Sequence, residues 1–492
     1  MVGLAVPAAA AMAAVTVATG KGLYVSPDSV FYVGTARSLL DGAGFRSPPG
    51  LQPLGHFPPL FTVVIAAVGR LGLDPLDAAR VVNIAVLGAI VVLVGLVLGA
   101  LTGSLPAALL GATLTAVAVD VLTLSAAALS EPLFVLLALA GLVVLAGYLD
   151  RRRPAVLAAA SALVALAVLT RYVGVALVGA GVAMLLWRGA ERRCHGAVDA
   201  IVFGVIAVVP ALAWLAWAGR VDGAGERSIV VHLFGGGYLA QAPRPLARWI
   251  VPWPGPPIGP VLALAVVVAA IVVVRRYRPR SSATSALPPM LAVFAVVYLA
   301  VLVANRALID ATGRLDSRFL MPLHVVALLL VVPVVYRLRA ERVVAIAAGV
   351  LVVAQVAGGL AWAAGGPTDD GIRRRGYTAS AWRESSIVAR MAAVSPPAVV
   401  YSNGFDAVYF LTGRIVHPIP ATKDYLTDRP NPDFDQEIAT MRADLERTGG
   451  LLVYFDAVTA RRSFLPSRVE LERALPLEAV VTDAVGTVYR LR

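Results

Sequence analysis

An acid and a tyrosine follow the first apolar stretch of the chain at a spacing that suits proton transfer. Asp28 and Tyr32 are four residues apart, so they share one face of a helix. Ser26 as N-cap and Pro27 at the first helical position predict that helix, and an acid in its first turn suits the helix dipole. Asp28 is therefore either a helix-dipole partner or a general base that takes the proton of an attacking hydroxyl group.

His56 is a weaker candidate, because the paired prolines 58–59 that follow it mainly end one element and begin another. It fits a hydrogen-bonding, a metal-ligating or a plain loop role. No second histidine is close in sequence, so a dedicated zinc site is not supported. A divalent metal is left open, and no cofactor is predicted with certainty.

Two further polar positions interrupt apolar runs. Glu131 begins such a run, where it either suits the helix dipole or serves a site by orienting an acceptor or holding an arginine. Arg171 and Tyr172 stand between two apolar runs. A charge there is costly unless it meets water or a partner, so Arg171 either snorkels to the membrane surface or reaches a phosphate.

The segment 305–322 carries three arginines and two acids ahead of another apolar run. Arginine suits the bidentate binding of phosphate, and Arg318 stands directly against the run, with Arg314 four residues before it. The alternative is local ion pairing, for example of Asp310 with Arg314, which near a surface is worth less than about 1 kcal/mol.

The amino-acid composition indicates whether these residues belong to a soluble or a membrane protein. The chain has 492 residues, of which 59% are hydrophobic and only 15% charged, against roughly 45–50% and about 25% in soluble domains. Repeated apolar runs of about 20 residues, separated by arginine-rich loops, predict a polytopic α-helical membrane protein. The net charge of +12 is assigned to those loops and not to nucleic-acid binding. A single cysteine excludes an internal disulfide framework.

Eleven spans are predicted from the apolar runs. They cover residues 2–20, 80–101, 105–124, 131–148, 155–169, 171–187, 197–218, 256–275, 286–304, 319–336 and 342–364. The first run also resembles a signal peptide, but we interpret it as a retained helix.

Arginine clusters predict the sidedness, because cytoplasmic loops are enriched in arginine and lysine. Clusters at 151–153, 188–193, 275–280 and 337–342 are placed in the cytoplasm. The N-terminus is then cytoplasmic, the first outer loop covers residues 21–79, and the tail lies outside. The run 59–72 is too short to cross about 30 Å of hydrocarbon and is interpreted as an interfacial helix. The rival is that it crosses and that one other span is misassigned.

The composition changes at about residue 365, which divides the chain into a membrane domain, 1–364, and a soluble tail, 365–492. In the tail, 398–401 and 451–455 are predicted as buried strands, and 480–483 with 488–491 as a hairpin. Helices are predicted near 378–393 and 434–448. The predicted fold is thus an all-α membrane protein with a small C-terminal α/β domain on the outer face.

These motifs, in their order and predicted sidedness, resemble the GT-C superfamily of membrane glycosyltransferases. The chain is most similar to the protein O-mannosyltransferase and lipid A aminoarabinose transferase family over about residues 1–340. The resemblance rests on the Asp28–Tyr32 spacing, the Pro58-Pro59-Leu60 helix start, Arg80, the Ser130-Glu131-Pro132 helix start, the Thr170-Arg171-Tyr172 turn, and Arg318 in Arg-Phe-Leu-Met-Pro.

The resemblance implies a polyprenyl-phosphate sugar as donor, bound at the outer face of a bacterial cell membrane, and an inverting single-displacement transfer. It implies Asp28 as catalytic base, with Glu131 beside it, and Arg318 as the group that handles the lipid phosphate. Tyr32, His56, Arg171, Tyr172 and Arg314 are then candidate substrate-binding residues. Many relatives have Glu where this chain has Ser29 and lack Phe57 between His56 and the prolines, so the acceptor stays open as a glycan, lipid or protein.

Two rival functions are a transporter or lipid flippase and a non-catalytic scaffold. A transporter is expected to place ionisable groups near the bilayer midplane, whereas the candidate residues here cluster at the predicted outer ends of spans. A catalytic protein predicts an outward cavity that contains Asp28, with Arg171 or Arg318 within reach of one phosphate.

Overall fold

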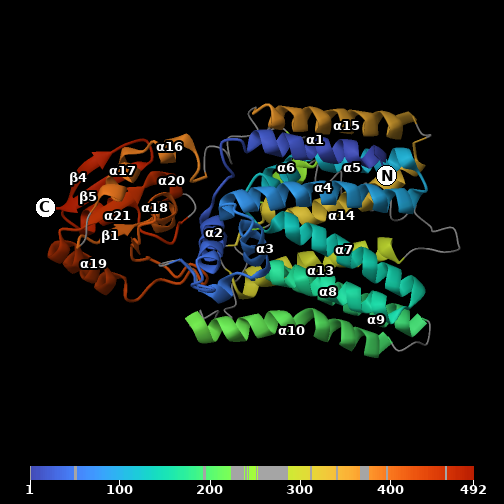
Figure 1. The fold of residues 1–492 in the computed structure, drawn as a ribbon, viewed down its shortest axis with the longest axis horizontal. Helices are drawn as coiled ribbons and strands as arrows, with labels where there is room; N and C mark the ends of the chain where they lie inside the picture. The colour runs from blue at the N-terminus through green and yellow to red at the C-terminus, as the bar shows by residue number, and fades with distance from the viewer. Residues whose placement is uncertain are drawn as a thin grey trace.

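The structure is a computed structural model, and Figure 1 shows a long helical bundle with a small mixed domain at one end. The described residues are 2–48, 53–191, 196–222, 238, 241, 243–250, 252, 286–310, 313–339, 342–365, 376–394, 397–459 and 462–492. The predicted span 256–275 and the arginines at 192–193 and 275–280 lie outside them.

The bundle consists of apolar helices, most of which run along one common direction (Figure 1). They are α1 (Val2–Ala18), α4 (Pro75–Thr102), α5 (Leu105–Val117), α6 (Val119–Ser125), α7 (Glu131–Arg151), α8 (Pro154–Thr170), α9 (Val175–Glu191), α10 (Gly196–Asp222), α13 (Leu287–Leu308), α14 (Ser317–Arg337) and α15 (Arg342–Ala363). A short helix, α11 (Pro243–Arg248), lies between α10 and α13 in the chain. The predicted polytopic membrane fold is confirmed.

Six of the described helices are long and apolar enough to cross a membrane, namely α4, α7, α10, α13, α14 and α15. The bent pair α5 and α6 makes a seventh. Helices α1, α8 and α9 are shorter apolar helices, and the total of eleven spans stays a prediction. As predicted, α8 and α9 meet at Thr170-Arg171, through the 3-10 turn η2 (Tyr172–Gly174).

The span predicted as one helix over 105–124 is broken. Its two halves, α5 and α6, meet at an angle of 56°, because Ala118 has extended backbone angles (φ −63°, ψ 111°). Asp120 then lies in the first turn of α6, where the helix dipole favours an acid. The sequence has no proline or glycine at the break, and Asp120, the one charged residue of the predicted span, was the available signal.

The segment 21–79, which was predicted as the first outer loop, supplies the elements that lie between the bundle and the small domain. They are α2 (Pro27–Leu40), η1 (Leu54–His56) and α3 (Leu60–Gly69). Helix α2 lies across the end of the bundle (Figure 1). The ten residues of α3 give a length of about 15 Å, half the hydrocarbon thickness, so its length suits the interfacial position predicted for 59–72.

The tail folds into a five-stranded sheet in the order β2-β1-β3-β5-β4. The strands are β1 (Val400–Ser402), β2 (His417–Pro418), β3 (Leu451–Phe455), β4 (Leu477–Thr482) and β5 (Gly486–Leu491). β1 pairs in parallel with β2 and β3, whereas β5 pairs antiparallel with β3 and β4. The two buried strands and the hairpin agree with the sequence prediction, and the two-residue strand β2 was missed.

Helices cover this sheet. They are α16 (Ser380–Arg383), α17 (Ser386–Ala393), α18 (Phe405–Thr412), α19 (Phe434–Thr448), α20 (Asp456–Thr459) and α21 (Arg468–Ala474). Helix α19 was predicted with the same bounds. The helix predicted over 378–393 is divided in two, because Ser385 leaves the helical conformation and accepts the Val388 N–H as N-cap of α17.

The hydrophobic core of the small domain includes residues of the outer loop. Val25 and Val30, from the segment that begins α2, are buried with Tyr377, Trp382 and Val453. The Tyr377 N–H also donates to the Val25 carbonyl (3.0 Å). On its other side this segment pairs with the bundle, where the Tyr24 N–H donates to the Ala126 carbonyl (3.1 Å). Helix α2 is thus held by both domains.

Candidate active site

Helix α2 presents Asp28 at its first turn. The Ser26 hydroxyl accepts the Ser29 N–H, and the Ser29 hydroxyl accepts the Ser26 N–H (3.1 Å), which forms a reciprocal cap. Pro27 fills the first helical position, where its missing N–H costs nothing. The cap therefore fixes the start of the helix and, with it, the backbone of Asp28.

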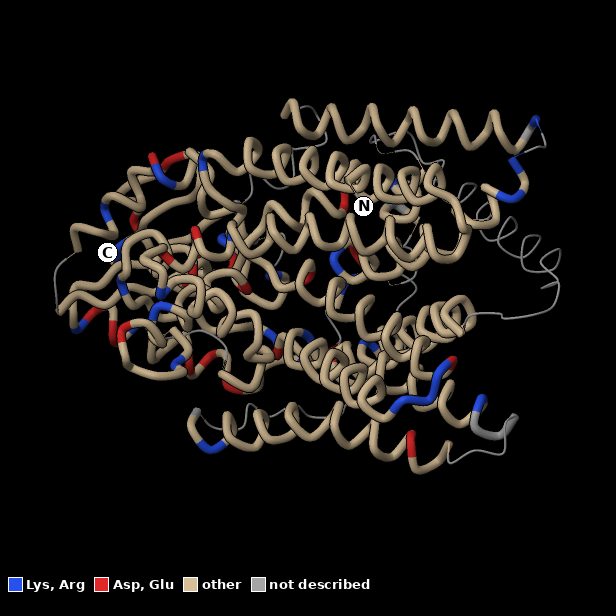
Figure 2. Tube along the Cα trace, turned by 45° about the vertical axis from the view of Figure 1, so that its right-hand side comes forward, with Lys and Arg blue, Asp and Glu red and all other residues tan. Residues whose placement is uncertain are grey.

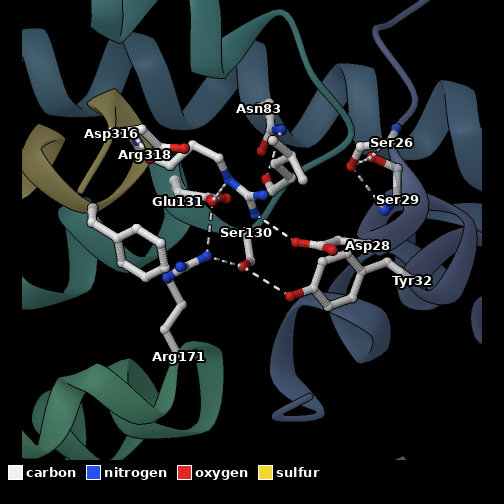
Figure 3. A network of polar contacts seen from close by, with 12 residues as sticks. Ser26, Asp28, Ser29, Tyr32, Asn83, Ser130, Glu131, Arg171, Asp316 and Arg318 are labelled. Carbon is white, nitrogen blue, oxygen red and sulfur yellow. Dashed lines mark hydrogen bonds and ion pairs between the residues drawn. The ribbon is translucent and has the colours of Figure 1, made fainter. Parts of the chain in front are cut away.

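Arg318 from α14 lies between two carboxylates, as Figure 3 shows. Its Nη2 donates to Asp28 Oδ2 (2.6 Å), and its Nε donates to Glu131 Oε1 (2.6 Å). The Asp316 side chain accepts the backbone N–H of Arg318 (3.0 Å) as N-cap of α14. The first helical turns of α2, α7 and α14 thus converge on one guanidinium group.

Arg171 joins the same network from the far side of Glu131 (Figure 3). Its Nη1 lies 2.9 Å from Glu131 Oε1, and it also donates to the Ser130 hydroxyl (3.4 Å). The Ser130 hydroxyl is in turn 3.2 Å from the Tyr32 hydroxyl. Glu131 is only 2% exposed, and a buried carboxylate is stable there because two cations face it.

Arg318 determines the ionisation of Asp28. Burial is the largest single influence on the pKa of Asp28 and raises it, but the charge and hydrogen bond of Arg318, together with the charges of Arg171 and His56, bring the pKa below its ordinary value of 3.8. Asp28 is therefore a carboxylate at neutral pH. For Tyr32, burial raises the pKa above its ordinary value of 10.0, so its hydroxyl stays protonated.

Asn83 of α4 is a positioning residue that the sequence analysis missed. Its Nδ2 donates to the carbonyls of Ala127 (2.7 Å) and Leu129 (3.1 Å), directly before Ser130 and Glu131. The side chain is fully buried. An amide inside a predicted span was the available signal, because polar groups in membrane helices are costly and usually serve a site.

A cavity of about 1680 Å³ opens between the end of the bundle and the C-terminal domain. Asp28 and Arg318 line it, together with the predicted site residues His56 and Arg314. On the opposite wall lie residues of the C-terminal domain, from the segment 418–441 and from 462–465. The ionic network is therefore open to a space that both domains enclose.

The other predicted site residues surround this cavity without lining it. Tyr32 is 2% exposed and packs between Phe57 and Phe61. The Tyr172 hydroxyl donates to the Gly55 carbonyl (2.9 Å), which fixes the loop that carries His56. Glu131 and Arg171 lie behind Arg318. Within the described ranges, no group of three or more His, Cys, Asp and Glu side chains is placed to hold a metal ion.

Comparison with known proteins gives likeness in structure only. No family model matches the chain, and none of the curated proteins matches its sequence. Among solved structures, ArnT from Cupriavidus metallidurans bound to undecaprenyl phosphate matches 98% of this chain over 97% of its own, with a TM-score of 0.52 and 17% identity. Apo ArnT from the same organism matches over the same shares, with a TM-score of 0.51 and 17% identity. The chain therefore shares the fold of these two ArnT structures over nearly its whole length, and the predicted membrane fold is confirmed.

Proposed function

We propose that this protein is a membrane glycosyltransferase that moves a sugar from a polyprenyl-phosphate donor to an acceptor hydroxyl group, with inversion and with Asp28 as general base. The observation that carries the proposal is the cavity at the end of the bundle that is lined by both Asp28 and Arg318. A carboxylate and a guanidinium side by side are what this reaction needs, and a solved structure with the same fold contains undecaprenyl phosphate.

The donor phosphate binds to Arg318 in exchange for a carboxylate. Arg318 uses Nε and Nη2 for Glu131 and Asp28, and a guanidinium has five N–H donors. Asp28 lines the cavity whereas Glu131 is buried behind it, so an entering phosphate displaces Asp28 and leaves the Glu131 contact. Glu131 and Arg171 then orient Arg318 without touching the substrate.

Transfer follows as a single displacement. The acceptor oxygen attacks the anomeric carbon, and the new glycosidic C–O bond forms as the bond from that carbon to the phosphate oxygen breaks. The acceptor proton goes to Asp28. The bonding electrons leave with the phosphate, whose negative charge Arg318 stabilises. No nucleotide takes part, which agrees with the absence of a phosphate-binding glycine loop from the sequence.

The setting supports transfer at a membrane face over transport. The cavity lies at the end of the bundle beside the C-terminal domain, and the charged groups that line it come from the first or last turns of helices and from loops. Alternating transport uses a site near the bilayer midplane. We place the protein in the bacterial inner membrane as a multi-pass protein, with the N-terminus in the cytoplasm and the cavity and C-terminal domain outside.

Incubation of the purified protein with a panel of polyprenyl-phosphate sugars tests the proposal. Wild-type protein is expected to release polyprenyl phosphate from at least one donor when acceptor is present. Asp28→Asn keeps the helix-cap geometry and is expected to lower kcat by about 10²–10⁴-fold, the usual contribution of a general base. Asp41→Asn, at the C-terminal end of the same helix, is the matched control. Normal transfer by Asp28→Asn overturns the base assignment, and no release from any donor overturns the function.

A further inference from the structure

The cavity is larger than one substrate head group requires. Ligand pockets typically have about 300–1,000 Å³, whereas this cavity has about 1680 Å³. The Asp28 and Arg318 end accounts for the donor phosphate. The remaining space extends along the C-terminal domain, over the segment between β2 and the first two turns of α19. A second substrate fits there without leaving the reach of the general base.

The C-terminal wall of the cavity has the side chains of a hydroxyl-binding surface. It presents the carboxylates of Asp424, Asp433 and Glu437 and the amides of Asn431 and Gln436. Carboxylate oxygens accept hydrogen bonds from hydroxyl groups, and amides both accept and donate them. The rings of Tyr401, Phe405, Tyr425 and Phe464 line the same wall, and apolar ring faces suit the C–H face of a sugar.

The loop that forms this wall is held by its own hydrogen bonds. Asp424 Oδ1 accepts the backbone N–H groups of Leu426 (3.1 Å) and Thr427 (2.7 Å). Asn431 Nδ2 donates to Glu437 Oε2 (2.9 Å) and to the Ala421 carbonyl (2.9 Å), which joins the loop to α19. Side chains fixed in this way bind a ligand with little loss of conformational entropy.

The charges on this wall disfavour a second phosphate. Three acids face the cavity from the C-terminal domain, together with two cations, Lys423 and Arg462. The Lys423 ammonium pairs with Asp428 (3.2 Å) and the Arg462 guanidinium with Asp406 (2.6 Å). An anionic acceptor would meet uncompensated carboxylates here, and like charges at close range are costly. A neutral polyhydroxylated acceptor meets hydrogen-bond partners.

A contact between Tyr425 and His56 joins the C-terminal wall to the part of the cavity that Asp28 and Arg318 line. The Tyr425 hydroxyl lies 3.3 Å from His56 Nε2, and the His56 ring packs on Phe57 with centroids 4.6 Å apart. His56 and Asp28 line the same cavity. An acceptor that lies along the C-terminal wall therefore ends near the carboxylate that takes its proton.

The geometry points to a neutral glycan as the acceptor, bound by Asp424, Asn431, Asp433, Gln436 and Glu437 on the C-terminal wall of the cavity. This inference rests on the proposed transferase function and adds the acceptor class to it. A glycan hydroxyl oxygen becomes the glycosidic oxygen, its proton passes to Asp28, and polyprenyl phosphate leaves.

Labelled donor identifies the acceptor class. The purified protein is incubated with polyprenyl-phosphate carrying a radiolabelled sugar and with an envelope extract of the source cells, which is then separated into neutral glycan, anionic lipid and protein fractions. Label in the neutral glycan fraction supports the inference. Label in the anionic lipid or protein fraction overturns it while leaving the transferase function intact. Label that stays on the donor overturns the function and the inference together.

Two variants of α19 test the location of the subsite. The double variant Gln436→Ala/Glu437→Gln removes the amide at position 436 and the charge at position 437, and it is expected to raise the acceptor KM by about tenfold or more, with the affinity for undecaprenyl phosphate unchanged. Glu446→Ala, which removes only an exposed ion pair with Arg442 on the same helix, is the control. An equal acceptor KM in the double variant and the control would contradict the proposal that the acceptor subsite lies on this wall.

Discussion

Arg318 is the residue on which the candidate site depends, because it holds carboxylates from two other elements. Asp28 is 290 positions away in the chain and Glu131 is 187 away. Removal of this side chain would leave a carboxylate that is 2% exposed without one of its two cations, which is strongly destabilising. A variant that keeps the charge is therefore the more informative probe of binding.

Arg318→Lys is expected to weaken binding of undecaprenyl phosphate. Lysine preserves a cation for Glu131, but it lacks the planar fork that contacts two anions at once. Loss of one charged hydrogen bond, roughly 1.5–3 kcal/mol, corresponds to about a ten- to hundredfold rise in Kd. Titration with undecaprenyl phosphate in detergent checks this. Arg37→Lys, at the exposed Arg37–Asp74 pair, is the control, and an equal Kd in both variants contradicts the assignment.

The pKa of Asp28 predicts a difference between two pH profiles. The carboxylate is the active form, so activity falls as pH falls through its pKa. In the free protein this pKa lies below 3.8, so the profile of kcat/KM should show no acid limb from Asp28 above about pH 4. When the donor phosphate binds, Asp28 loses its contact with Arg318 and its pKa rises. The acid limb of the kcat profile should therefore lie at higher pH than that of kcat/KM. Acid limbs at the same pH in the kcat/KM and kcat profiles would contradict the proposal that phosphate replaces Asp28 on Arg318.

The same depressed pKa sets the sign of its effect on stability. Asp28 has a lower pKa in the folded protein than the value of about 3.9 expected in an unfolded chain. The ion pair therefore stabilises the fold above that unfolded value, and the contribution is lost as pH falls through the folded pKa. Near neutral pH the contribution of the ion pair is fully present, so stability there should not change with pH through this group.

At the scale of elements, α2 is positioned by contacts on two sides. Its first turns pack into the core of the C-terminal domain through Val30, which is 1% exposed, and the segment before it pairs with residues 126–128 of the bundle. Asp28 lies two residues from Val30. The C-terminal domain therefore helps to place the proposed base, in addition to forming a wall of the cavity.

Val30→Ala is expected to lower kcat by about tenfold or more, because a shift of about 1 Å in a catalytic group can cost up to a hundredfold. Val488→Ala is the matched control, since Val488 is fully buried in the same core but belongs to β5, where it pairs with Val453 of β3 and Val481 of β4. Each change should lower stability by about 1.5–3 kcal/mol. The kcat and the thermal stability of the two variants are measured side by side. Equal losses of kcat would mean that the packing of Val30 does not position α2 for catalysis.

Local patterns predicted most elements but not how they meet. The cap of α2, the helix α19 and the hairpin of β4 and β5 follow from residues near in sequence. The break at Ala118 carries no proline or glycine signal, and β2 is too short to show a period. The bridge from Asp28 through Arg318 to Glu131 joins residues that only tertiary packing brings together, so the sequence predicted its members and their common side but not their contacts.

At the scale of the whole molecule, charge separates the two ends of the bundle. Figure 2 shows many charged residues in the C-terminal domain and further ones at the opposite helix ends, whereas long stretches of the helices carry none. At that opposite end, Arg152 pairs with Asp199 (2.9 Å), which joins the end of α7 to the start of α10. The Arg152 end and the candidate site thus lie at opposite ends of the bundle, and that the arginine-rich end faces the cytoplasm stays a prediction.

Cysteine labelling in intact cells tests this orientation. In a background with the native cysteine replaced, Cys194→Ser, a single cysteine is placed either at Ala443 of α19 or at Arg153 between α7 and α8. Both positions are exposed, so neither change disturbs a packed core. A membrane-impermeant maleimide is expected to label Ala443→Cys in intact cells, because the proposed topology places the C-terminal domain outside, and to label Arg153→Cys only after permeabilisation. The reverse pattern would place the cavity on the cytoplasmic side. It would contradict the proposed topology, and both donor and acceptor would then have to be cytoplasmic.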